Sequence, residues 1–447
     1  MNNSVPTPAI EFSEDSTTTL ATSLKSSLMI NGIEFKGSCD VELNLFSDPR
    51  IYFNAVFENV DNSYQLMMAL GPQNNIKLMV DNVDIRGFIL SCDHIKDGKL
   101  CIVWCPRSSR VGLMPSNEPN IQKLTFHLFN FNKITGDSAI DTSTTNMSRF
   151  TNVLNLNNYE WETQVFSVSQ DVSENMVRKE FQKQFSLSHV GEIIKKSGPF
   201  TGEEVVEELN CLKYALSFSV GSWVEPVCPV GYGIDSSIVW NMWSTPHKSK
   251  GKPFHWLDFD SGSDLSNMYP KFSNKWKSES WQKTLKEVIY WYIHSNDQSV
   301  NIDAGIILTI TAIERLSYEY TVNERKLISR EGFKKLRHSD MLRLLFASLN
   351  IPVEISGQKK HFFKKLNLNN KDSQDAAFIL SEIRNSLIHP DNKFHGKADG
   401  DIYFKAWTMG QWYLELSILA IIGYDGKYID RTLDGFTSRS ELPWNEV

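Results

Sequence analysis

The chain has 447 residues, of which 41% are hydrophobic and 22% are charged, as expected for a globular protein of two or three domains. Its net charge of −7 argues against a protein that coats nucleic acid generally, although it still allows a local basic groove. Six cysteines are too few for a disulfide framework in a chain of this length, which favours a reducing, cytoplasmic location.

The N-terminal residues 1–25 are polar and acidic, and we expect them to form a flexible tail. They carry neither the basic start nor the apolar core of a secretory signal. No stretch of the chain reaches eighteen uninterrupted apolar residues, so we expect no membrane partner.

Residues 26–150 predict a β-rich N-terminal domain, to which we assign a sensor or regulatory role. Short segments such as 39–46 and 50–57 alternate apolar and polar residues, as strands with one buried face do. Clusters of Asn, Asp, Gly and Pro separate these segments and predict turns. The pattern indicates an antiparallel sheet, either a sandwich or a partial barrel.

Residues 151–277 predict a mixed α/β middle module. Thr201 and Glu204 have the spacing of a capping box, with Thr201 as the N-cap of a helix. Aromatic segments separated by Pro and Gly follow this helix and indicate an irregular, packed region.

Residues 278–424 predict an all-α helical bundle, and residues 425–447 a C-terminal tail. Helical periodicity covers 281–295, 303–320, 338–349, 372–389 and 403–424. Their lengths and short connections suit an up-and-down bundle. The predicted fold class is therefore α+β and multidomain.

The fourth of these helices ends in Arg-Asn-Ser-Leu-Ile-His, residues 384–389, followed by Pro390. An arginine can hold a phosphate through two hydrogen bonds, and a histidine can move a proton near neutral pH. Pro390 disfavours helical geometry at His389, which should place the imidazole where the helix ends. Chance alone produces such an Arg–His spacing roughly once in a chain of this composition, so the context has to support the assignment. The alternative is a salt-bridging Arg384 and a helix-capping His389.

A helical bundle closed by this motif resembles the HEPN superfamily, and most closely its Apea-like and YopA-type members from bacteria and their mobile elements. The stretches that carry the resemblance are GIILTITAIERL (305–316) and EIRNSLIHP (382–390). The resemblance implies a metal-independent endoribonuclease that needs no cofactor. It also implies that Arg384 and His389 are catalytic, that Asn385 orients them, and that two copies form a homodimer through the bundle.

RNA cleavage by this route would use the 2′-hydroxyl of the substrate as the nucleophile. The reaction needs one group that accepts the hydroxyl proton and another that protonates the leaving 5′-oxygen. It also needs positive charge near the transition state. One copy of the motif supplies one histidine and one arginine, so we expect a second copy to supply the other pair.

Two further features support this interpretation. Glu314 lies in a strongly apolar helix, and we expect it to pair with Arg384, unless it faces solvent at the helix edge. Residues 324–365 contain eleven Lys or Arg and four acids, a net charge of +7 that suits a groove for phosphates. The alternative is a solvated helix face. The candidate RNA-binding residues are Lys334, Lys335, Arg337, Lys359, Lys360, Lys364 and Lys365.

The sequence thus predicts a cytoplasmic, metal-independent endoribonuclease that acts in antiviral defence, in abortive infection or as a toxin. Its expected partners are RNA, with transfer RNA as one candidate, a second copy of the chain, and a phage-derived trigger. A first alternative is a non-catalytic dimer that binds RNA or a protein partner. A second is a ligand receptor whose β domain senses a phage or sugar component.

Overall fold

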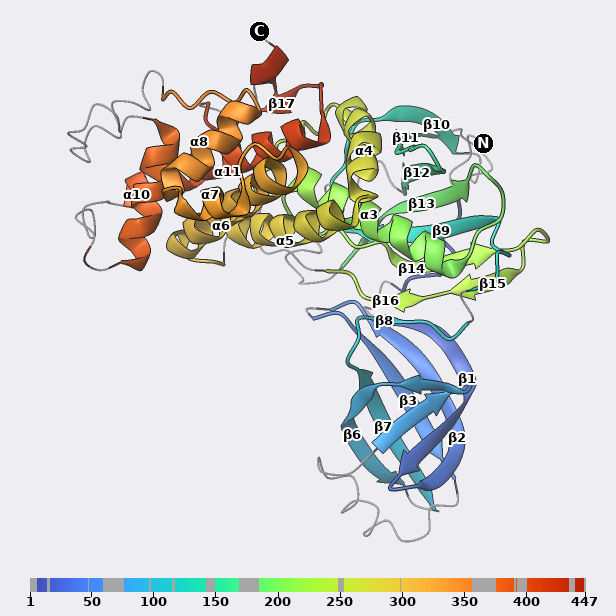
Figure 1. Ribbon diagram of the computed structural model, residues 1–447. Coiled ribbons are helices and arrows are strands. Elements are labelled where there is room, and N and C mark those ends of the chain that lie inside the picture. The colour runs from blue at the N-terminus through green and yellow to red at the C-terminus, as the bar shows by residue number, and fades with distance from the viewer. Residues whose placement is uncertain are drawn as a thin grey trace.

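The α+β fold class is confirmed, with strands dominating the N-terminal half and helices the C-terminal part (Figure 1). The computed structural model describes residues 6–13, 17–46, 48–58, 76–95, 98–114, 117–141, 149–168, 185–247, 253–297, 299–355, 375–389, 391, 400–433 and 439–445. Figure 1 shows a curled sheet at the N-terminal end, a second sheet with helices beside it, and a helical C-terminal part.

The N-terminal part is a seven-stranded antiparallel sheet with the strand order β5-β4-β1-β2-β3-β7-β6. β4 and β6 lie near opposite ends of this order yet contact each other, so the sheet curls around its own core (Figure 1). The strands are β1 (Thr17–Ile30), β2 (Ile33–Asn44), β3 (Arg50–Phe57), β4 (Ile76–Val80), β5 (Val83–Ile85), β6 (Gly87–Ile95) and β7 (Lys99–Pro106).

Alternation of apolar and polar residues explains this sheet, because successive side chains of a strand point to opposite faces. Val41, Leu43 and Phe53 are fully buried, while Glu42 and Tyr52, on the opposite face, are partly exposed. The start of the sheet differs from the prediction, since β1 begins at Thr17, inside the range expected to be a tail. Its polar first half pairs with β2 through two register shifts, which obscure the period-2 pattern in the sequence.

A second antiparallel sheet has the strand order β10-β11-β12-β13-β9-β14-β15. Its strands are β9 (Lys123–Phe129), β10 (Asp137–Asp141), β11 (Arg149–Asn155), β12 (Trp161–Ser167), β13 (Leu187–Lys195), β14 (Val227–Tyr232) and β15 (Ile238–Asn241). β9 lies inside this sheet, so the boundary between the first two parts precedes residue 123 instead of following residue 150. A short pair, β8 (Arg110–Val111) with β16 (Trp243–Ser244), adjoins the second sheet.

Helix α3 (Gly202–Val220) begins with the predicted capping box. The Thr201 hydroxyl accepts a hydrogen bond from the Glu204 N–H, and the Glu204 carboxylate accepts one from the Thr201 N–H. Its C-cap, Gly221, has a φ of 69°, a left-handed conformation that glycine adopts at little cost.

Replacing Thr201 with alanine should lower the free energy of unfolding by about 1 kcal/mol, because one N–H of the first turn loses its partner. Ser278, the N-cap of α5 (Glu279–Asn296), is the matched control, since its side chain makes no capping hydrogen bond. Urea unfolding of both alanine variants measures the difference. Equal losses at the two positions would contradict the assigned cap.

Residues 425–447, predicted to be a tail, contain a short antiparallel pair, β17 (Tyr428–Ile429) with β18 (Arg439–Ser440). The rest of the C-terminal part consists of helices that pack mainly against one another (Figure 1). In addition to α5 they are α4 (Gly262–Trp276), α6 (Ile302–Tyr318), α7 (Arg330–Lys335), α8 (His338–Ser348), α10 (Ala376–Ile388) and α11 (Gly400–Ile422). A π-helical turn, Glu319–Glu324, continues α6. None of the helices in the described ranges combines the length and apolarity that crossing a membrane requires.

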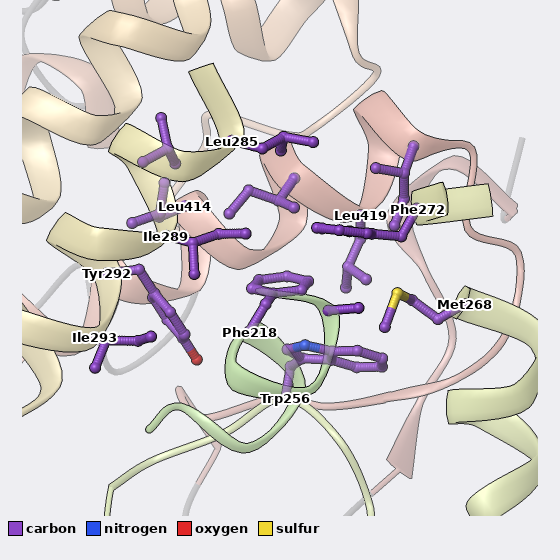
Figure 2. Close-up of a cluster of buried hydrophobic side chains, with 14 of the residues drawn as sticks. Phe218, Trp256, Met268, Phe272, Leu285, Ile289, Tyr292, Ile293, Leu414 and Leu419 are labelled. Carbon is purple, nitrogen blue, oxygen red and sulfur yellow. The ribbon is translucent and has the colours of Figure 1, made fainter. Parts of the chain in front are cut away.

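One hydrophobic core joins the second sheet to the C-terminal helices. Figure 2 shows Phe218 of α3 and Trp256 in one cluster with Leu285 and Ile289 of α5 and Leu414 of α11. All five side chains are buried at 0% exposure. The middle and C-terminal parts therefore share one core, whereas most of the first sheet's residues pack in a separate core.

Two buried histidines, one half-buried histidine and one buried glutamate make the stability of this fold sensitive to pH. Burial lowers the pKa of His127 and His255 to about 4 and that of His189 to about 3. Burial also raises the pKa of Glu208 to about 7. Hydrogen bonds from Tyr269 and Asn158 lower this pKa, but their effect is smaller than that of burial. Each folded imidazole is neutral at pH values where the unfolded one is charged.

Lowering the pH from 7 to 5 should therefore destabilise the protein. In the unfolded chain a histidine binds a proton below about pH 6.5, whereas in the folded protein it does so only below about pH 4. This difference lowers the free energy of unfolding at pH 5 by about 2 kcal/mol for each histidine. Glu208 acts in the opposite direction, because on lowering the pH its carboxyl gains a proton in the folded protein before it does so in the unfolded chain. The resulting stabilisation is about equal to the destabilisation caused by one histidine. Urea unfolding of His189→Leu at both pH values should show about 2 kcal/mol less pH dependence than the original chain. An unchanged dependence would contradict the neutral, buried state of His189.

Candidate functional site

Helix α10 positions the Arg–Asn–His motif. Its N-cap is Asp375, whose carboxylate accepts a hydrogen bond from the Phe378 N–H at 2.8 Å. It ends at Ile388, and His389 is the C-cap with the extended dihedrals φ −119° and ψ 103°. The prediction that the imidazole stands where the helix ends is confirmed. Pro390, to which we attributed this ending, lies outside the described residues.

The three motif residues lie at the exposed end of α10. His389 is exposed, whereas Arg384 and Asn385 are half-buried. Arg384 Nη1 donates a hydrogen bond to Asn385 Oδ1 at 3.2 Å, so the amide steadies the guanidinium. The His389 N–H donates to the Asn385 carbonyl at 2.9 Å. Asn385 thus contacts both of its neighbours in the motif.

The guanidinium of Arg384 has spare hydrogen-bonding capacity. Its Nε is buried and has no hydrogen-bond partner within the described part of the chain. Across those same ranges, no carboxylate forms an ion pair with it. A buried N–H without a partner costs free energy, and a bound anion would remove that cost.

The expected pairing of Glu314 with Arg384 is wrong. The Glu314 carboxylate on α6 lies 2.8 Å from Nε2 of His338, at the start of α8, and Nδ1 of His338 lies 2.8 Å from the Ser381 hydroxyl on α10. Both carboxylate and imidazole are largely shielded, with side-chain exposures of 29% and 14%. His338 was not predicted as a partner, since no sequence spacing relates it to Ser381, which lies 43 residues later.

His338 links three helices and does not supply a second catalytic imidazole. Both of its ring nitrogens face partners, as described above. Ser381 also precedes His389 by eight residues, which is about 12 Å along a helix. The Ser381 hydroxyl in turn donates to the Ala377 carbonyl inside α10. We assign His338 and Glu314 the role of positioning α10 against α6 and α8.

The predicted basic region is only partly described. Lys334, Lys335 and Arg337 are exposed on α7 and at the start of α8, consistent with a surface that meets phosphates. Lys334 forms an exposed ion pair with Glu331 at 3.1 Å. The remaining candidates lie outside the described residues: Lys359, Lys360, Lys364 and Lys365.

A buried ion pair elsewhere in the C-terminal part was not anticipated. The Arg431 guanidinium donates through Nε to Glu415 of α11 at 2.9 Å and also through Nη2, and both side chains are 1% exposed. The Tyr292 hydroxyl of α5 donates to the same carboxylate at 2.6 Å. The signal available in the sequence was a lone Glu in an otherwise apolar helical stretch.

The comparisons with known proteins identify what the chain is similar to. Residues 116–253 match the family model of the YopA central domain, and residues 278–441 match that of the YopA C-terminal domain. The chain is similar to YopA. The SPbeta prophage-derived uncharacterized protein YopA of Bacillus subtilis (strain 168) is 24% identical over 406 residues, which cover 88% of this chain and 86% of that protein. No solved structure matches the chain.

The similarity to YopA corrects the family prediction. The segment that resembles HEPN proteins, from about residue 280, matches the YopA C-terminal domain, and no HEPN family matches. The resemblance was misleading because an apolar helix and an Arg–His spacing recur by chance. The roles of Arg384, Asn385 and His389 therefore depend on their geometry alone.

Proposed function

We propose that the protein is a metal-independent endoribonuclease whose chemistry is carried by Arg384 and His389. The supporting observation is an exposed imidazole at the end of α10, close in sequence to an arginine that no described carboxylate neutralises. Arg384 binds the scissile phosphate and stabilises the negative charge that develops on it. His389 accepts or donates the proton.

In this proposal the reaction needs only groups that protein side chains and RNA provide. The 2′-hydroxyl loses its proton to one imidazole and attacks the adjacent phosphorus, while the 5′-oxygen leaves and takes a proton from a second imidazole. The products are a 2′,3′-cyclic phosphate and a 5′-hydroxyl. Because His338 is engaged by Glu314 and Ser381, the second imidazole is His389 of another copy of the chain.

Cleavage of end-labelled RNA by the purified protein in EDTA tests this proposal. We expect cleavage of transfer RNA or single-stranded RNA, and none of DNA of the same sequence, which lacks the nucleophile. Cleavage that EDTA abolishes, or that DNA also undergoes, would contradict the proposal. Light scattering of the same sample measures whether the active species is the dimer.

The biological role that we propose is growth arrest or defence within the cytoplasm. The supporting observation is that the relative from Bacillus subtilis is a prophage-derived protein. Expression in bacteria should slow growth if cellular RNA is cut, and His389→Ala should relieve this effect. Equal growth inhibition by the original chain and the variant would contradict the proposed role.

A further inference from the structure

A cluster of aromatic and basic side chains lies apart from the motif of α10, where the second sheet's connections meet α5. Four segments contribute to it: α3, the loop after α3, the residues after β16, and α5. α3 and α5 pack directly against each other (Figure 1). The members of this aromatic–basic cluster are Lys213, Tyr214, Trp223, His247, Tyr290 and His294.

The rings of the cluster contact one another around Trp223. Its ring centroid lies 5.7 Å from those of Tyr214 and His247, and 6.3 Å from that of Tyr290. Tyr290 in turn lies 4.2 Å from His294, one helical turn further along α5. These distances are typical of interacting aromatic rings, so the cluster forms a continuous platform.

The outer part of this platform is open to solvent. Tyr290 is 49% exposed although its neighbours Ile289 and Tyr292 on the same helix are fully buried. His247 is also exposed, and Trp223 and His294 are partly exposed. A half-exposed ring that other rings support from one side offers a flat surface for stacking another ring.

One cation lies over the platform, and a second cation shares its carboxylate partner. Lys213 lies with its ammonium 5.2 Å from the Trp223 ring centroid and 2.5 Å from Glu225. Arg110 pairs with the same carboxylate at 2.6 Å, so two cations share one buried anion. Lys213 and Arg110 together exceed Glu225 by one positive charge, so this ion-pair group is cationic.

We propose that the aromatic–basic cluster binds one nucleotide unit of single-stranded RNA. The base stacks on the exposed face of Tyr290, and Lys213, His247 and His294 contact the adjacent phosphate. Aromatic stacking combined with cations is the means by which proteins hold single strands without reading their sequence. This inference rests on the proposed function in taking RNA as the ligand, but it concerns binding by residues outside the cleavage motif.

Fluorescence anisotropy of a labelled uridine oligonucleotide tests the inference. The full chain carries His389→Ala in every sample, so the oligonucleotide stays intact. Tyr290→Ala should weaken binding about tenfold, the usual effect of losing one stacked base. Tyr290→Phe, which keeps the ring, should bind within about twofold of the parent. Tyr159→Ala is the matched control, because Tyr159 is an 88% exposed tyrosine outside the cluster.

An abasic oligonucleotide of the same length separates stacking from charge. The parent should bind it about tenfold more weakly than the uridine oligonucleotide, whereas Tyr290→Ala should bind the two alike. Equal affinity of parent and Tyr290→Ala for uridine oligonucleotide would overturn the inference, as would equal weakening by Tyr159→Ala. If binding follows these expectations but the original chain does not cut RNA, the proposed function fails and the binding site stands.

Discussion

Replacing Glu415 with leucine should lower the free energy of unfolding by about 3–5 kcal/mol, the largest loss of stability expected for any single change considered for this protein. The reason is that Arg431 would keep its charge in a fully buried position. An arginine cannot lose its proton, and its partner carboxylate is the anion that compensates for the lost hydration. Urea unfolding at pH 7 measures the effect.

Two comparisons make this prediction specific to the buried pair. The double variant Glu415→Leu with Arg431→Met should recover most of the lost stability, since apolar residues of similar volume replace both charges. Glu331→Ala breaks the exposed pair with Lys334 and should cost less than about 1 kcal/mol. A double variant as unstable as Glu415→Leu would show that the loss has another origin.

His389→Ala and Arg384→Ala should each lower the rate of RNA cleavage strongly while leaving the fold intact. Loss of a general acid or base costs about 10²–10⁴-fold, and loss of a positive charge at the transition state costs about 10²–10³-fold. His389 is exposed at a helix end, so its removal should not alter packing. Rates from single-turnover assays and melting temperatures of the same preparations measure both effects.

Asp391→Ala is the matched control for these variants, because Asp391 is exposed two positions beyond His389. Its cleavage rate should remain within about twofold of the original, since it carries none of the proposed chemistry. Unchanged rates in His389→Ala or Arg384→Ala would reject the roles assigned to those residues. A fall in melting temperature that parallels the loss of activity would instead assign them to structure.

Local signals in the sequence predicted the elements that depend on neighbouring residues. The capping box of Thr201 and Glu204 and the end of α10 at Ile388 are both set by a few adjacent side chains. The strands of residues 39–46 and 50–57 followed from alternation, because one face of each is buried.

The contacts between distant segments could not be predicted in this way. The partner of Glu314 comes from the start of α8, whereas the sequence offered Arg384 as the candidate partner. The shared core of α3, α5 and α11 depends on how helices pack, which apolar periodicity does not specify. Arg431 appeared to belong to a polar tail because nothing near it signals burial.

The most direct test of the central claim uses RNA in which the nucleotide 5′ to one cleavage site carries a 2′-deoxyribose. The purified protein in EDTA should cut all of the unmodified sites at their normal rates and leave the modified linkage intact, because attack by the 2′-hydroxyl is the proposed step. The fragments should end in 2′,3′-cyclic phosphate and begin with 5′-hydroxyl. Cleavage at the deoxy position, or fragments that begin with 5′-phosphate, would contradict the account.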